Sequence, residues 1–281
     1  MNVLTVNVGQ GSLAVVKHNH EAIIVDSRIP PSGDDTVAFV KGIFSSALKD
    51  HRVKGLILTG FDSDHSDATG VAIVLRKYQP DWVLYPKYFK DTNEAKAVFG
   101  IIREQQKLRE GSASPLTAVS VRLDRLDDRN LKNLSTNFSF ELFSPHIEDM
   151  DSSNNCSIVL KVTGLGNGGF SYLITGDTET GRWERISRLF GKSLKSHVLA
   201  APHHGSKNGV HPDSLLFIEP HTVHISAGVD SQYGHPDPQA VRAYAKVAKY
   251  VYATNMENGV SLLTQAGSGE LGTQLIPSSD S

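Results

Sequence analysis

Two aspartates and a histidine, Asp62, Asp64 and His65, lie within four residues of one another directly after a short apolar run. That run ends in Thr59-Gly60, which is typical of a buried strand that stops at the rim of a sheet. Carboxylate and imidazole groups at this spacing can aim at one point, and such mixed ligands suit zinc, manganese or iron. The same residues also fit an Asp-rich, solvated turn that caps the following helix, so this stretch by itself leaves both interpretations open.

Similar side chains follow three later strand-like runs. Asp177 comes after the first of them, the pair His203-His204 after the second, and His235 after the third. If these strands are stacked in the same sense, their ends converge on one edge. A shared carboxylate surrounded by imidazoles is what a two-metal hydrolase needs to hold its ions, roughly 3.5–4 Å apart. A lone histidine is more often structural, but Asp and His grouped at several strand ends favour a metal site.

The order of apolar patterns predicts the architecture that must position these side chains. The chain has two halves that each mix strands with helices, and no Pro-, Gly- or Ser-rich linker separates them. We therefore expect an α/β fold, a four-layer αββα sandwich with two sheets face to face and helices outside, as a single domain over residues 1–281. Strands are predicted at residues 3–8, 13–16, 22–25, 56–58, 82–85, 117–123, 138–143, 157–162, 170–175, 197–200, 222–226, 250–253, 260–264 and 271–275, and helices at 34–48, 67–77, 91–109, 179–190 and 238–247.

Composition narrows the class of protein. The chain has 281 residues and a formal net charge of −2, so no overall basic character indicates a nucleic-acid binder. No apolar run approaches the length of a membrane span, and the first residues do not resemble a signal peptide. A single cysteine, Cys156, excludes an intramolecular disulfide. Together these features lead us to expect a cytoplasmic protein with no membrane association.

Several motifs together resemble the metallo-β-lactamase superfamily. They are, in chain order, NVGQGS, IIVDS, LTGFDSDHSDATG, NNCSIVL, LITGDTE, PHHGS and YGHP. Within the superfamily, the chain is most similar to the hydrolase-like domain of the ComEC competence proteins and to stand-alone relatives of that domain. The resemblance covers nearly the whole chain and is loosest over residues 87–137. It implies the same four-layer sandwich and a hydrolase that depends on one or two divalent ions, most often zinc or manganese.

The resemblance also implies which residues of this chain correspond to the metal ligands of the superfamily. The superfamily motif HxHxDH falls on Gly60, Asp62, Asp64 and His65, so a glycine replaces the first histidine. Another superfamily histidine has no match, because its position falls near Asn154-Asn155.

On this mapping the two metal sites are unequal. Asp177 matches the carboxylate that bridges the metals, His203 resembles a ligand of site one, and His235 resembles the last ligand of site two. The predicted metal ligands are therefore Asp62, Asp64, His65, Asp177, His203 and His235, with site two complete and site one short of ligands.

The resemblance also implies a mechanism. A metal-bound hydroxide would attack a phosphorus centre, and Asp177 would position it between the ions. His204 has two interpretations: it could protonate the leaving group or hydrogen-bond a phosphate oxygen, or it could orient a neighbouring ligand. We therefore predict Asp64, Asp177 and His204 as catalytic residues.

Three functions follow from these residues. The first is a phosphodiesterase or nuclease that acts on nucleic acid or a nucleotide. The second is a degenerate member of the fold that binds a nucleotide or protein partner without catalysis, because Gly60 removes one ligand. The third, hydrolysis of a lactam or lactone, is the least favoured by the motifs. The substrate, the native metal, the occupancy of site one and the oligomeric state are left open.

Overall fold

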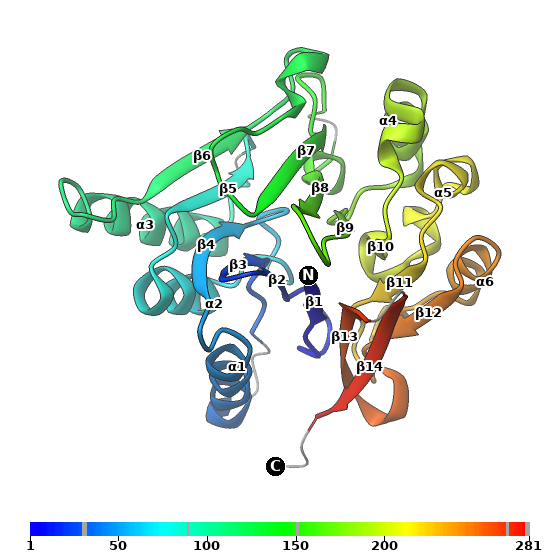
Figure 1. Ribbon diagram of the computed structural model, residues 1–281, viewed down its shortest axis with the longest axis horizontal. Coiled ribbons are helices and arrows are strands. Elements are labelled where there is room, and N and C mark those ends of the chain that lie inside the picture. Colours follow the sequence, from blue (N-terminus) through cyan, green and yellow to red (C-terminus); the bar gives the residue numbers. More distant parts are fainter. Residues whose placement is uncertain (30–32, 89, 150–151, 268–269, 279–281) are drawn as a thin grey trace.

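The computed structural model describes residues 1–29, 33–88, 90–149, 152–267 and 270–278. Two sheets face each other, with α1, α2 and α3 beside one sheet and α4, α5 and α6 beside the other (Figure 1). This is the four-layer αββα arrangement that the sequence predicts. The division of the chain into domains stays a prediction.

The first sheet is mixed and has eight strands. Its order is β14 (Leu271–Pro277), β13 (Val260–Ala266), β1 (Asn2–Thr5), β2 (Ala14–His18), β3 (Glu21–Val25), β4 (Arg52–Ile57), β5 (Trp82–Pro86) and β6 (Thr117–Val121). Strands β3 to β6 are parallel to one another, whereas β1, β2, β13 and β14 pair in antiparallel fashion. The C-terminal ends of β3, β4 and β5 therefore lie at one edge.

The second sheet has six strands. Its order is β12 (Tyr250–Ala253), β11 (Thr222–Ile225), β10 (Val198–Ala200), β9 (Ser171–Ile174), β8 (Val159–Gly164) and β7 (Phe138–Ser144). Strands β9 to β12 are parallel, so the loops that follow them also leave from one edge. A backbone hydrogen bond of 2.9 Å, from the amide of Ile158 to the carbonyl of Thr59, joins this edge to the first sheet.

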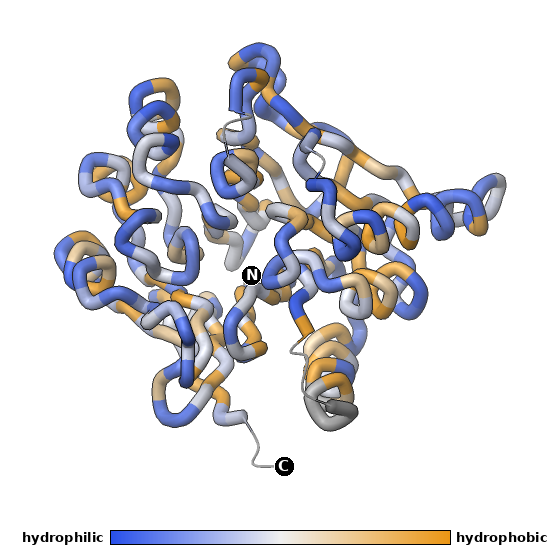
Figure 2. Tube along the Cα trace, turned by 180° about the vertical axis from the view of Figure 1, so that it is seen from behind, coloured by the Kyte–Doolittle hydropathy of each residue, from blue (hydrophilic) through white to orange (hydrophobic). Residues whose placement is uncertain are grey.

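The helices are α1 (Gly33–Ala47), α2 (Ala68–Ile73), α3 (Asn93–Leu108), α4 (Thr180–Phe190), α5 (Pro212–Ile218) and α6 (Pro238–Ala245). Apolar and polar segments alternate along their coils in Figure 2, as they do in amphipathic helices. Five of the six match predicted helices. The sequence analysis did not predict α5, which has only seven residues, too few for a clear helical period.

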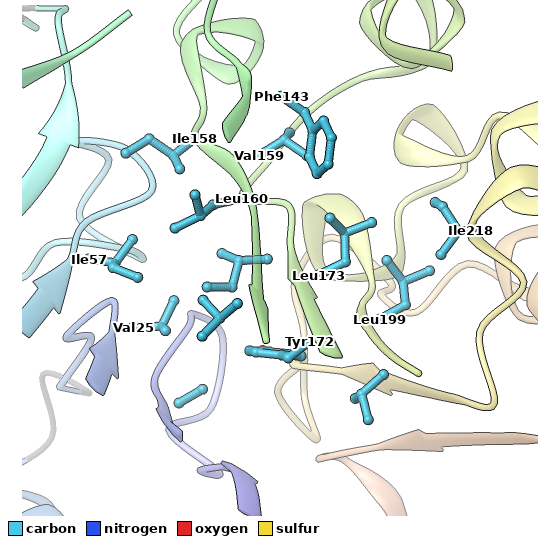
Figure 3. Close-up of a cluster of buried hydrophobic side chains, with 14 of the residues drawn as sticks. Val25, Ile57, Phe143, Ile158, Val159, Leu160, Tyr172, Leu173, Leu199 and Ile218 are labelled. Atoms are coloured by element: carbon cyan, nitrogen blue, oxygen red, sulfur yellow. The ribbon is translucent and has the colours of Figure 1, made fainter. Parts of the chain in front are cut away.

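Successive strand residues point to opposite faces, which builds two cores. In β3, Ile23 packs between the two sheets, whereas Ile24 packs under the outer helices of the first sheet. Figure 3 shows the inter-sheet cluster, which runs from Val25 and Ile57 of the first sheet through Leu160 of the second sheet and on to the outer helices. The two cores hold the sheets in fixed relation, so side chains from different sheets can meet. No helix in the described ranges combines the length and the hydropathy needed to cross a membrane.

Two helical glycines provide a matched test of how closely α2 packs. A Cβ at Gly70 would lie 1.8 Å from the Ser27 carbonyl oxygen, whereas a Cβ at Gly100 of α3 would meet no atom within 4 Å. We expect Gly100→Ala to raise the free energy of unfolding by about 0.5–1 kcal/mol, because alanine is the better helix former. We expect Gly70→Ala to lower it by about 1–3 kcal/mol through overpacking.

Denaturant titration of both variants measures these changes. Equal effects of the two substitutions would contradict the close contact between α2 and the backbone beside Asp26.

Candidate metal centre

Four side chains from the two sheets meet at the shared edge. One ligand atom from each of Asp64, His65, Asp177 and His204 lies within 4.8 Å of all the others. Asp64 and His65 belong to the loop after β4, Asp177 follows β9, and His204 follows β10. His65, Asp177 and His204 are buried, and Asp64 is partly exposed.

His65 lies between two carboxylates. Its Nδ1 atom is 2.9 Å from an oxygen of Asp26, and its Nε2 atom is 2.9 Å from an oxygen of Asp177. Burial by itself would lower the pKa of His65, but Asp177 and Asp26 reverse this effect and raise its pKa well above the usual value. The ring is therefore fixed in orientation, with Nε2 facing the cluster.

Asp26 is itself held by the strand end beside it. Its carboxylate accepts a 2.7 Å hydrogen bond from the Thr59 amide and a 2.9 Å hydrogen bond from the Thr59 hydroxyl. Asp26 is only 1% exposed, so this buried charge depends on these donors and on His65. A carboxylate behind a metal-ligating imidazole fixes its tautomer and orientation in known metal sites.

His204 is anchored in a similar way by a different partner. Its Nδ1 atom donates to the Ser226 carbonyl oxygen at 2.9 Å, because a carbonyl can only accept. Its Nε2 atom is buried, 3.5 Å from Asp64 and 3.6 Å from Asp177, and has no closer polar partner among the described residues. Burial would lower the pKa of His204, but Asp177 and Asp64 reverse this effect and raise the pKa. A neutral His204 would thus direct an unused lone pair at two carboxylates.

The histidines also set the charge state of Asp177. Burial would raise the pKa of its carboxyl group, but His65 and His204 outweigh burial and hold the pKa well below its usual range. The Asp177 backbone amide donates to the Ser157 hydroxyl at 3.0 Å, which fixes the residue in place. Two carboxylates and two imidazole nitrogens form a donor set that suits a divalent metal ion, and the buried, unpartnered Nε2 atom of His204 fits such a ligand.

The structure places the remaining predicted ligands outside this group. The carboxylate of Asp62 forms an ion pair with the Lys90 ammonium. The ring centroids of His203 and His235 lie 6.0 Å apart, and within the described ranges the buried Nδ1 atom of each has no hydrogen-bond partner. The Nδ1 atom of His203 is 3.9 Å from Glu179, and the His235 ring stacks on Tyr233.

The grouping of the histidines differs from the mapping that the resemblance implied. His204 stands where the mapping expected His235, as the imidazole beside Asp64, His65 and Asp177. The physical reason is the turn after β10, in which His203 and His204 both have positive φ, 51° and 55°. Such left-handed residues are uncommon and cluster at functional sites. Sequence spacing could not show which of two adjacent histidines this turn directs inward.

Sequence reasoning also missed supporting residues. The sequence analysis does not identify Asp26, Lys90 or Glu179 as residues that support the site. The signal for Asp26 in the sequence was its position directly after the predicted strand at residues 22–25. No signal identified Lys90, which comes from a loop after β5.

Comparison with solved structures bears on the fold of the chain. The structure of Igni18, a novel metallo hydrolase from Ignicoccus hospitalis KIN4/I, aligns with a TM-score of 0.50 and 13% sequence identity, covering 95% of this chain and 100% of that one. The chain has a metallo-β-lactamase fold. No protein-family model matches it.

A relative found by sequence supports the ComEC-like resemblance. ComE operon protein 3 of Bacillus subtilis (strain 168) is 29% identical over 216 residues, which are 77% of this chain and 25% of that protein. The chain therefore spans about a quarter of the length of the curated relative it matches. The ComEC-like resemblance that the motifs indicated is confirmed by this relative.

Asp26→Asn tests the support that Asp26 gives to His65. The amide keeps the shape of the side chain but removes the charge that holds the imidazole, so we expect metal affinity to fall about 10–100-fold. Calorimetric titration of metal-free protein with Zn²⁺ measures this change.

Asp81→Asn is the matched control, because Asp81 pairs with Arg52 and Lys54 and is absent from the cluster. Unchanged affinity in Asp26→Asn would show that His65 does not depend on this contact.

Proposed function

We propose that the chain is a metal-dependent hydrolase that cleaves phosphodiester bonds in nucleic acid or in a nucleotide. The observation that carries the proposal is the four-residue cluster, in which two anchored imidazoles and two carboxylates face one another across the joined sheets. The motif resemblance to ComEC-like hydrolase domains supports the same class of reaction.

In this proposal Asp64, His65, Asp177 and His204 hold a divalent ion, for which zinc and manganese are the best candidates. A bound ion of this kind acidifies water and offsets negative charge that develops on substrate oxygens. Asp26 keeps His65 in the tautomer that offers Nε2, and the Ser226 carbonyl does the same for His204. Asp177, between both imidazoles, is well placed to orient a water molecule.

Positive side chains beside the cluster favour an anionic substrate. Arg28 donates from Nη1 to the Ser63 carbonyl oxygen at 3.0 Å and forms an ion pair with Asp67 at 3.8 Å. Lys90, from the loop after β5, forms an ion pair with Asp62 in the loop after β4. Arginine and lysine are the usual partners of phosphate oxygens. With a net charge of −2 for the whole chain, local contacts of this kind suit a short or nucleotide-sized substrate better than long DNA.

Hydrolysis of bis-p-nitrophenyl phosphate by metal-loaded protein tests the proposal. We expect turnover with Zn²⁺ or Mn²⁺, and we expect Asp177→Asn to reduce it roughly 100–1,000-fold, since a loss of several kcal/mol of stabilisation corresponds to that factor. Asp81→Asn, a surface substitution of the same type, should retain the wild-type rate.

Two results would contradict the proposal. Wild-type rates in Asp177→Asn would remove the cluster from the reaction. A wild-type protein that binds no metal and hydrolyses no phosphodiester would instead favour the binding scaffold that Gly60 first suggested.

A further inference from the structure

Lys90 lies beside Asp62, next to the loop that carries two residues of the candidate metal centre. It follows β5, whose neighbour β4 leads into the loop that carries Asp62, and the two strands are parallel. The two loops therefore leave the same edge, and the Lys90 ammonium forms an ion pair with the Asp62 carboxylate. Asp62 is thus supplied with a positive charge by the protein itself.

Asp62 lacks a cluster of ligand atoms that could hold a second ion with it. Among the described residues, the unpartnered Nδ1 atoms of His203 and His235 form no group of three or more ligand atoms with Asp62. Residue 60 is glycine and has no side-chain atom that could ligate a metal ion. The amide nitrogen of Asn154 has no available lone pair and donates at 3.0 Å to Glu179. In the part of the chain that the structure describes, Asp62 joins no group of three clustered ligand atoms. A lone carboxylate is a poor site for a divalent ion.

We infer that this chain binds one divalent ion, at Asp64, His65, Asp177 and His204, and that the Lys90 ammonium takes the place of a second cation at Asp62. An ammonium has three donors and no lone pair, so it cannot ligate a metal and it repels a nearby cation. One donor serves Asp62, and the side chain is 28% exposed, which leaves it accessible to a substrate oxygen. Lys90 is then the anion-binding group of the site.

This inference deepens the proposed function and rests on it for the nature of the substrate. Its test does not depend on catalysis. Metal-free protein is loaded with excess Mn²⁺ or Zn²⁺, separated from unbound ions, and analysed for bound metal per chain. The variants are Gly60→His, Lys90→Met, Lys90→Arg and the double variant Gly60→His/Lys90→Met.

The glycine can accept a side chain, which makes the double variant informative. A Cβ at Gly60 would meet no atom within 4 Å, and its φ is not in the left-handed region. Methionine at position 90 keeps an unbranched chain without charge, and arginine keeps the charge as a control. Thermal unfolding of each variant confirms that it is folded before metal is measured.

We expect one bound ion in wild type and in each single variant, Gly60→His, Lys90→Met and Lys90→Arg, and two in the double variant. Mn²⁺ electron paramagnetic resonance gives a second readout, because two ions that share a carboxylate couple magnetically and one ion does not. Two ions in the wild type, or only one in the double variant, would overturn the inference. One ion in wild type without phosphodiester hydrolysis would contradict the proposed function and leave the single-ion site standing.

Discussion

The buried contact between His65 and the two carboxylates on either side of it is the constraint on which the site depends. Asp26 and His65 come from the first sheet, and Asp177 comes from the second, so this chain of charges crosses the interface between the layers. Buried charges are costly unless they are paired. If both imidazoles of the cluster act as neutral ligands, the carboxylates of Asp26, Asp64 and Asp177 need a compensating cation. The charge balance of the site therefore depends on the metal ion proposed to bind there.

The inter-sheet core makes this arrangement possible. Each sheet contributes one part of the cluster, so the distance between Asp64 and His204 depends on how the two layers pack. Buried residues such as Ile57, Leu160 and Tyr172 fill the space between the sheets behind the shared edge. Tightly packed interiors transmit small shifts with little loss. A core substitution far from the edge can for this reason change the site.

Much of the fold could be predicted from the sequence, because the apolar pattern of a strand or a helix lies within one continuous segment. The positions of Asp64, His65 and Asp177 at strand ends were predicted for the same reason. The choice between His203 and His204 could not be, since it depends on two left-handed residues in one turn. The pairing of Lys90 with Asp62 depends on which strands are neighbours, and no local pattern records that. The helix α5 was not predicted, because its seven residues are too few to show a clear helical period of apolar residues.

Anomalous X-ray diffraction from crystals of the Zn²⁺-loaded protein tests the central claim most directly, because it locates the ion without any assumption about the substrate. The account predicts a peak within about 2.0–2.2 Å of ligand atoms of Asp64, His65, Asp177 and His204. A peak between His203 and His235, or no ordered ion at the cluster, would contradict it.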